Sequence, residues 1–402
     1  MSIERNSRFS LFILMVNMFI VMTGIGLIVP IMPTIIHEFD AGGKTFGLLI
    51  ATFSFAQFLF SPLAGDLSDR LGRKKTIIAG LILFSVSQLL FAVSEHLWVL
   101  FVSRALGGIG GAFMIPSMMA YVADITTIEN RAKGMGRLGA SMSLGFVIGP
   151  GMGGLLAEFG MRAPFFTAAA VAATAAILST FLLPETKRKE TTSSPQKRES
   201  LLKQLVHSVK TPYFPLLIMV FTVSFGLANF QSTISLFSDI KFSFTPMDIS
   251  ILIVVAGLMG VIVQAFVLER MVRRFGESSV INGSLIVAAI TMLSLLLAQG
   301  FWSVLIISAV FFIATSLLRP AINTMVSKMA GDEQGFAAGM NNAYMSIGNV
   351  IGPAIAGALL DMNLNFPYIF GSVIIMICLL ISSKWAKSSI NEAEVGYSHR
   401  SN

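Results

Sequence analysis

The sequence predicts an all-helical membrane protein in which twelve transmembrane helices form two pseudo-symmetric six-helix bundles. The first observation behind this prediction is composition, because 54% of the 402 residues are hydrophobic and only 12% are charged. Soluble proteins carry about 25% charged residues, so this chain cannot build a solvated globular surface. The second observation is a glycine-rich stretch that returns half a chain length later, which indicates two homologous halves.

Twelve apolar segments along the chain each measure about 20 residues, the length that crosses the hydrocarbon core once as a helix. They lie near residues 9–30, 46–65, 75–93, 97–121, 136–158, 164–183, 212–236, 248–268, 278–298, 301–325, 336–360 and 366–386. A polar stretch after the sixth segment divides them, so we expect bundles at 1–184 and 212–402, with a cytoplasmic linker at 185–211 and a cytoplasmic tail after the last helix.

The repeated stretch lies in the fifth segment, where residues 143–154 read Ser-Leu-Gly-Phe-Val-Ile-Gly-Pro-Gly-Met-Gly-Gly. The same template recurs at Ser346–Gly357, in the eleventh segment. Small residues in a membrane helix let two backbones approach closely. The stretch therefore predicts a helix-packing motif made of Gly145, Gly149, Pro150, Gly153 and Gly154.

The basic residues predict the orientation of the helices. Of the 28 Lys and Arg residues, 23 fall in segments that are cytoplasmic if both termini are inside, and Lys44, Arg162 and Lys241 fall outside. The remaining two, Arg104 and Arg319, lie within predicted helices. Because cytoplasmic loops carry the excess of positive charge, we expect both termini in the cytoplasm. The net charge of +7 is then a topology signal, and no nucleic-acid partner is expected.

The sequence offers no basis for an enzyme. The four His and the single Cys378 form no cluster with metal-ligand spacing, so no metal is expected. No phosphate-cradling loop and no nucleophile elbow occurs, so no cofactor is expected either.

A motif rich in glycine and charge follows the second segment, Gly65-Asp-Leu-Ser-Asp69-Arg-Leu-Gly-Arg-Lys-Lys75, in a predicted cytoplasmic turn. Asp69 is expected to meet the positive N-terminus of the helix that starts near Gly335. The predicted cytoplasmic gate comprises Gly65, Asp69, Arg70, Gly72 and Arg73. The alternative is a solvated loop that simply follows the distribution of positive charge.

This motif resembles the loop signature of the major facilitator superfamily, G-x-L-x-D-R-x-G-R-K. Residues Leu100–Gly110 resemble the fourth-helix motif of that family, which carries a buried Arg, here Arg104. Residues Gly145–Gly154 resemble the fifth-helix motif of its drug/proton antiporters. The stretches Gly24–Pro30 and Leu318–Asn323 are similar to the NorA- and Bmr-type multidrug efflux pumps.

The resemblance implies a monomer in the bacterial cell membrane, embedded in the lipid bilayer, that exports small hydrophobic drugs, quinolone-like and dye-like, in exchange for protons. It also implies alternating access between two rocking bundles. One alternative is an exporter of one specific lipid, sugar or metabolite on the same fold. Another is a membrane sensor or scaffold that transports nothing.

The resemblance further implies carboxylates in the seventh and tenth helices, for cations and protons. The matching positions here are Gln231 and Ser316, and no acidic residue lies in the middle of a predicted helix. Polar residues on the helices that border the family's cavity are the candidate drug contacts, with interhelical hydrogen bonding as their alternative role. They are Asn17, Asn229, Gln231, Ser316 and Arg319.

Proton coupling needs a group that titrates, which an always-protonated Arg cannot supply. The candidates by elimination are carboxylates at helix ends, Asp66, Asp124 and Glu158, together with Arg104 as a relay residue beside them. For Arg104 the alternative is a structural side chain that binds helix carbonyls. For Asp124 it is an ion pair with Arg73 or Arg131 that holds the cytoplasmic gate.

Overall fold

The apolar segments fold as long α-helices, because a helix satisfies each backbone N–H and C=O within its own segment where no water is available. The computed structural model describes residues 2–186 and 201–398. Within those residues, 12 helices are long and apolar enough to cross a membrane. The predicted all-helical fold with twelve spans is confirmed.

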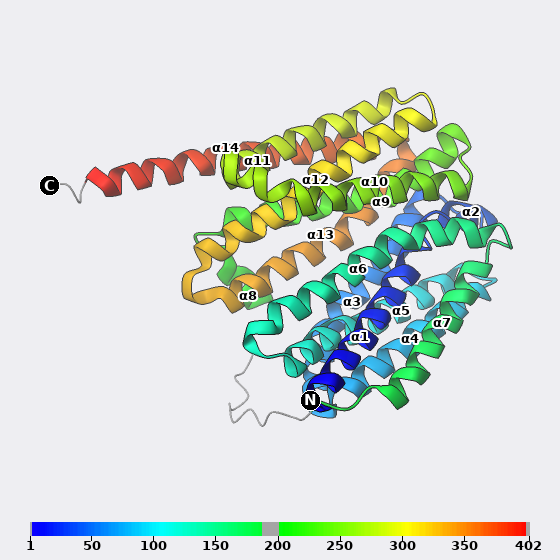
Figure 1. Ribbon diagram of the computed structural model, residues 1–402. Coiled ribbons are helices and arrows are strands. Elements are labelled where there is room, and N and C mark those ends of the chain that lie inside the picture. The colour runs from blue at the N-terminus through cyan, green and yellow to red at the C-terminus, as the bar shows by residue number, and fades with distance from the viewer. Residues whose placement is uncertain (1, 187–200, 399–402) are drawn as a thin grey trace. The chain divides into compact units, whose positions relative to one another are not determined.

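The helices follow one another along the chain, and apart from the stretch between α7 and α8 their connections are short (Figure 1). They are α1 (Ser2–Gly26), α2 (Met32–Glu38), α3 (Gly43–Leu71), α4 (Arg73–Ala92), α5 (Leu97–Ile125), α6 (Ile128–Ala157), α7 (Ala163–Leu182), α8 (Leu201–Ser208), α9 (Phe214–Phe242), α10 (Pro246–Phe266), α11 (Leu268–Ser294), η1 (Leu295–Leu297), α12 (Phe301–Ala330), η2 (Gly331–Glu333), α13 (Gln334–Met362) and α14 (Phe366–Ser398). The spans exclude the short α2 and α8.

Two compact units make up the chain. The first unit is Met1–Ser194 with Ile234–Val254, and the second is Pro195–Thr233 with Val255–Asn402. Helices α9 and α10 therefore contribute residues to both units. These units follow contacts rather than chain order, so the predicted division at 184 and 212 stays a prediction. Residues 187–200 of the predicted linker lie outside the described residues.

In the first unit, α5 packs on α3 and α4, α1 packs on α6, and α7 packs on α4. Figure 1 shows α1, in dark blue, beside α6. The core between these helices is apolar and fully buried, with Leu14, Met18, Phe84, Met118 and Tyr121 at 0–1% exposure. The second unit repeats this pattern of neighbours, because α11 packs on both α12 and α14.

The turn after the second span is shorter than expected. Helix α3 continues through Leu71 and α4 starts at Arg73, which leaves Gly72 alone between them. Gly72 has a φ of 104°, a conformation that glycine adopts without steric cost. Most of the motif Gly65–Lys75 is therefore helical, and the predicted turn shrinks to one residue. The first span also ends early, at Gly26 rather than residue 30.

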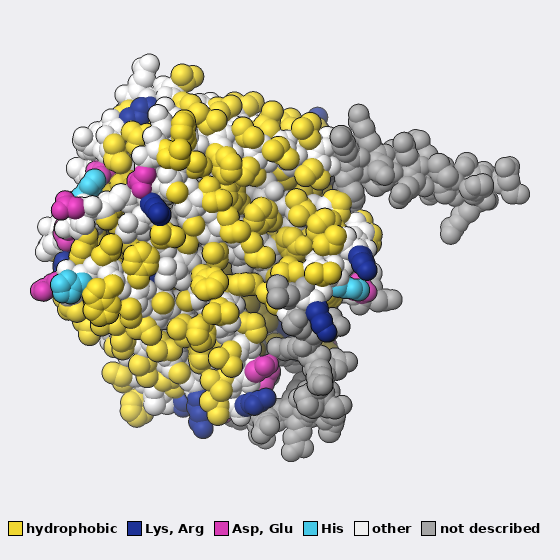
Figure 2. Space-filling view, turned by 180° about the vertical axis from the view of Figure 1, so that it is seen from behind, with side chains coloured by type: hydrophobic (Ala, Val, Ile, Leu, Met, Phe, Trp, Pro, Cys, Tyr) yellow, Lys and Arg dark blue, Asp and Glu magenta, His cyan; other side chains and the backbone are white. Residues whose placement is uncertain are grey.

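The outer surface of the spans is largely hydrophobic. On the face in Figure 2, yellow hydrophobic side chains cover the middle, and charged side chains lie toward the edges. Large apolar side chains are exposed on helix faces, among them Phe181 at 79% and Trp302 at 73%. Contiguous exposure on this scale would be unusual for a soluble monomer. The distribution is the one that lipid contact requires.

Candidate functional site

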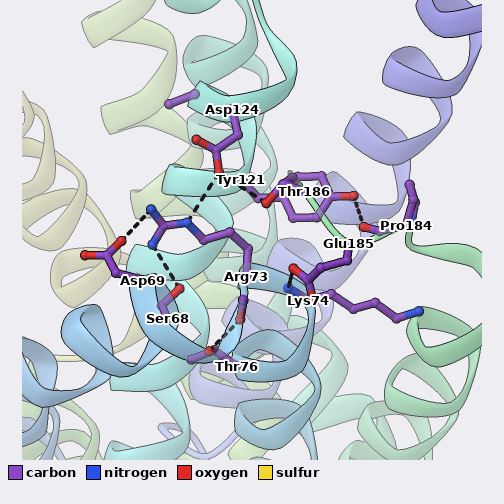
Figure 3. A network of polar contacts seen from close by, with 12 residues as sticks. Ser68, Asp69, Arg73, Lys74, Thr76, Tyr121, Asp124, Pro184, Glu185 and Thr186 are labelled. Carbon is purple, nitrogen blue, oxygen red and sulfur yellow. Dashed lines mark hydrogen bonds and ion pairs between the residues drawn. The ribbon is translucent and has the colours of Figure 1, made fainter. Parts of the chain in front are cut away.

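The strongest cluster of polar contacts in the first unit surrounds Arg73, the first residue of α4 (Figure 3). Its guanidinium reaches three side chains at once. The Nη2 atom lies 2.6 Å from the Asp69 carboxylate, Nη1 donates to the Ser68 hydroxyl at 3.1 Å, and Nε lies 3.3 Å from the Asp124 carboxylate. Arg73 thereby connects the end of α3 with the end of α5.

Residues after α7 complete this cluster. The Glu185 carboxylate accepts a hydrogen bond from the backbone N–H of Lys74 at 3.1 Å. Thr186 donates to Asp124 at 3.3 Å, and the Tyr121 hydroxyl donates to the carbonyl oxygen of Pro184. Figure 3 shows these groups converging on the start of α4. We call Ser68, Asp69, Arg73, Lys74, Asp124, Glu185 and Thr186 the Arg73 network.

The Glu185 carboxylate also lies close to Gly72, whose positive φ already favours glycine. A methyl carbon on Gly72 would lie 2.6 Å from the carboxyl carbon of Glu185, closer than van der Waals contact allows. A carboxylate at the first turn of α4 also interacts favourably with the helix dipole. Sequence reasoning missed Glu185 and Thr186. The available signal was their position directly after an apolar helix, in a chain whose acidic residues all lie near helix ends.

The predicted gate residues divide in the structure. Asp69 and Arg73 form an ion pair one helical turn apart, whereas Gly65 has open space where a side chain would stand. The Arg70 side chain is exposed. The cap that Asp69 was expected to provide for the helix near Gly335 stays a prediction.

Arg104 lies within α5 and is 5% exposed. Its guanidinium carbon lies 4.7 Å from the ring centre of Phe91 and 5.9 Å from that of Phe53. Phe91 in turn stacks on Phe165 of α7 at 4.4 Å. Among the described residues, Nε of Arg104 has no hydrogen-bond partner. Aromatic faces attract this buried cation, where the structural alternative expected helix carbonyls, and the relay role of Arg104 stays a prediction.

Gly145 and Gly149 of α6 lie directly against the backbone of α1, and Gly153 lies against Leu27, the residue that follows α1. A methyl carbon on Gly149 would lie 2.7 Å from the carbonyl oxygen of Thr23, and one on Gly153 would lie 2.2 Å from that of Leu27. Pro150 sits beside Gly26, and Gly154 faces Ser250 of α10. These positions therefore hold two backbones in contact, as close packing of membrane helices requires.

Comparison with known proteins identifies the fold and the family. The family model for the Major Facilitator Superfamily matches residues 14–313 and 216–393. The chain belongs to the major facilitator superfamily. The resemblance seen in the three sequence motifs is thereby confirmed.

Curated members of this superfamily align along nearly the whole chain. "Multidrug resistance protein 2" of Bacillus subtilis (strain 168) is 42% identical over 392 residues, or 96% of this chain and 98% of that protein. "Quinolone resistance protein NorA" of Staphylococcus aureus (strain MRSA252) is 38% identical over 358 residues, or 89% and 91%. The protein is thus a multi-pass membrane protein with bacterial relatives.

Solved structures share the superfamily fold at low sequence identity. A bacterial homologue of the human lysosomal transporter Spinster, in an inward-facing and occupied conformation, gives a TM-score of 0.79 at 17% identity, covering 94% of this chain and 96% of that one. The nucleoside transporter NupG gives 0.76 at 11% identity, covering 94% and 98%. These matches bear on the fold alone.

Two predicted drug contacts of this superfamily member hold helices together in the structure. Nδ2 of Asn17, on α1, donates to the Ser179 hydroxyl of α7 at 2.8 Å. Nδ2 of Asn229, on α9, donates to the carbonyl oxygen of Pro367 at 3.1 Å. Both asparagines are at most 2% exposed. In this conformation both amides make the interhelical hydrogen bonds named as their alternative role.

The other three candidates are less buried. Gln231 and Arg319 are intermediate in exposure, and Ser316 donates to the carbonyl oxygen of Ile313 within α12. Nε of Arg319 is buried and has no hydrogen-bond partner among the described residues. A drug's acceptor group would satisfy this donor, so the role of Arg319 in the cavity stays a prediction that the geometry leaves available.

The proton-coupling candidates lie in different environments. Asp124 belongs to the Arg73 network, and Arg131 donates instead to the carbonyl oxygen of Ala123. Glu158 follows the last residue of α6 and is exposed, at the far end of that 30-residue helix from Asp124. Asp66 is exposed on α3. The structure thus joins Asp124 to Arg73 and leaves Glu158 apart from them.

Proposed function

We propose that this protein exports small hydrophobic drugs, including quinolone-like and dye-like compounds, across the bacterial cell membrane in exchange for protons. The observation that carries the proposal is its identity of 38–42% to multidrug and quinolone resistance proteins over at least 89% of the chain. An alignment over 96% of the chain includes nearly all of its membrane helices.

Transport proceeds by alternating access, in which two six-helix bundles, residues 1–184 and 212–402, rock around a central site. The excess of Lys and Arg in alternate connections supports cytoplasmic positions for both termini and for the Arg73 network. A single chain supplies both bundles, so the monomer is the working unit. Drug and proton compete for one binding site, and each conformational swing therefore carries one or the other.

The chemistry of the candidate residues suits apolar drugs with few polar groups. Two neutral polar groups and one cation come from Gln231, Ser316 and Arg319. The other residues of these helices are mostly hydrophobic. Pockets of this composition bind by apolar contact and use a few polar groups for orientation.

The decisive experiment uses purified protein in sealed lipid vesicles carrying an imposed proton gradient. We expect movement of a fluorescent dye and of a quinolone that stops when a protonophore collapses the gradient, with protein-free vesicles as the control. An exporter of one lipid, sugar or metabolite would move neither of these unrelated compounds. Failure of both compounds to move in vesicles with a verified gradient would overturn the proposal.

A further inference from the structure

The second unit contains a charged contact at the start of its own third span. Helix α11 breaks at Gly276, where φ is 76°, and the long part of the helix begins at the next residue, Glu277. The Glu277 carboxylate pairs with the ammonium group of Lys328, near the end of α12, at 2.5 Å. The pair therefore ties α11 to α12, the helix on which it packs.

This pair stands at the positions equivalent to Arg73 and Asp124 of the first unit. Counting 204 residues from Gly72, Arg73 and Asp124 leads to Gly276, Glu277 and Lys328. Both glycines have positive φ, and both following residues form an ion pair with the end of the span packed alongside. The signs are opposite, because Arg–Asp in the first unit is replaced by Glu–Lys in the second.

The next charge along is reversed as well. Arg273 stands 204 residues after Asp69, one helical turn before Glu277. Its side chain is exposed. The second unit keeps few residues of the loop signature. Even so, Glu277 and Lys328 both carry the charge opposite to that of their counterparts, Arg73 and Asp124. Attraction between opposite charges depends on their product, so it survives such a double change.

We propose that Glu277 and Lys328 are positioning residues for transport, forming a charge-reversed counterpart of the Arg73–Asp124 contact that holds the turn at Gly276 against α12. This inference rests on the proposed transport function. It assigns a role to a contact that lies outside the candidate drug site.

The two contacts differ in whether their positive and negative side chains can be exchanged. Arg73 serves Asp69, Ser68 and Asp124, so its replacement by a carboxylate breaks three interactions. Among the residues that the structure describes, Glu277 meets one charged partner, and Lys328 is 63% exposed. Exchanging the two charges in the second unit therefore preserves the Glu277–Lys328 ion pair, whereas the same exchange in the first unit breaks the contacts of Arg73 with Asp69 and Ser68.

The test compares Glu277→Lys, Lys328→Glu and the double exchange in the vesicle assay. We expect each single change to lower the maximal rate of dye transport about fivefold, the scale of a lost ion pair at a partly exposed site, with the half-saturating dye concentration unchanged. The double exchange should return the rate to within about twofold of the parent. Membrane content and melting temperature in detergent are measured alongside, since a purely structural role would move those instead.

The matched control exchanges the charges of the first unit, Arg73→Asp with Asp124→Arg, and should remain as slow as either single change. A double exchange at 277 and 328 that is no faster than its single variants would overturn the proposal. So would a parent-like rate in Glu277→Gln.

A second measurement separates this inference from the transport proposal. Spin labels at Ser279 and Thr324, on a Cys378→Ser background, report the distance between α11 and α12. We expect a narrow distribution in the parent and the double exchange, and a broad one in each single reversal. If the parent protein moves no drug, the transport proposal fails, and these distances still decide whether the pair positions the two helices. Equal distributions in all four proteins would overturn the positioning role.

Discussion

The same glycine template packs two helix pairs, α6 on α1 in the first unit and α13 on α9 in the second, and the two are not equally close. Along α6, methyl carbons at Gly145 and Gly149 would lie 2.6 and 2.7 Å from carbonyl oxygens of α1, and one at Gly153 would lie 2.2 Å from that of Leu27, directly after α1. Along α13, the values at Gly348 and Gly352 are both 2.8 Å from carbonyl oxygens of α9.

The third position distinguishes the pairs. Where α6 has Gly153, α13 has Ala356, which is fully buried and therefore packed around its methyl group. The backbone of α6 is thus in contact with the segment that runs from α1 to Leu27 over three successive turns. The backbones of α13 and α9 are in contact over two. The repeated glycine motif consequently preserves the contact between the helix backbones in both units. The residue at the third position, Gly153 or Ala356, determines how far along the helices that contact extends.

The largest expected effect comes from a long side chain at the closest point of the first pair. We expect Gly153→Leu to reduce drug transport below detection, because a side chain there must push Leu27 and α1 away. Membrane insertion should persist, since leucine is more apolar than glycine. Efflux in vesicles and protein content in membranes measure the two effects.

The control for this change lies on the same helix. Gly139 has no atom within 4 Å of where a side chain would stand, so Gly139→Leu should transport at the parent rate. Parent-like transport by Gly153→Leu would show that α1 and α6 tolerate separation, and the close-packing interpretation would then be wrong.

A smaller change tests the third position directly. Gly153→Ala adds the methyl group that the second unit already accommodates, and overpacking should lower stability by about 1–3 kcal/mol. Ala356→Gly removes that methyl group, costs about 1 kcal/mol through helix propensity, and should leave transport unchanged. Melting in detergent and efflux rates compare the two. A stabilised Gly153→Ala would mean that the first pair has room for a methyl group.

The sequence predicted what depends on composition and spacing. Apolar length gave the twelve spans, and the repeat placed Gly149 and Gly153 in a contact before their partner helix was known. The partner itself could not be predicted, because a span that is apolar on all sides has no polar face to show which side is buried. Gly108, whose methyl carbon would lie 2.2 Å from the Phe53 carbonyl oxygen, was missed for the same reason.

Polar contacts were harder to predict than spans. Asp124 and Arg73 were paired correctly as an alternative, because both lie at helix ends on the same predicted side. Glu185 comes 111 residues after Lys74, and nothing in the chain signals that the two are adjacent. Asn17 and Asn229 appeared suitable for a cavity, whereas their hydrogen bonds to α7 and to Pro367 depend on helix register, which only the folded packing specifies.

The turns before α4 and α11 provide the next test of the comparison between units. Asp69→Asn removes an ion pair with Arg73 and the proposed cap on the helix near Gly335, so we expect a severalfold lower maximal rate with little change in drug affinity. Arg273→Gln alters the equivalent exposed position of the second unit and should transport like the parent. Rates and half-saturating concentrations separate the two variants.

A structural measurement decides which role of Asp69 matters. If the cap stabilises the state closed on the cytoplasmic side, Asp69→Asn should shift spin-label distances between the cytoplasmic ends of the two bundles toward the inward-facing state. An unchanged distance distribution with a lowered rate would assign the effect to the Arg73 ion pair and remove the gate hypothesis.

The smallest expected effect on drug movement, and the most specific one, concerns the carboxylates at opposite ends of the first unit. Coupling requires a group that releases a proton where drug is collected, and Asp124 stands in the Arg73 network, where a cation lies 3.3 Å away. Movement of Arg73 away from Asp124 would break this ion pair and leave the carboxylate without its cation. Glu158 is exposed and lacks such a partner among the described residues.

We therefore expect Asp124→Asn to move drug with fewer protons, and Glu158→Gln to keep the parent ratio of protons to drug. Proton release per drug, measured in vesicles with a pH-sensitive dye, compares the two. An undiminished ratio in Asp124→Asn, combined with a lowered rate, would make Asp124 a structural partner of Arg73, as Lys328 is of Glu277, and would exclude it as the coupling carboxylate.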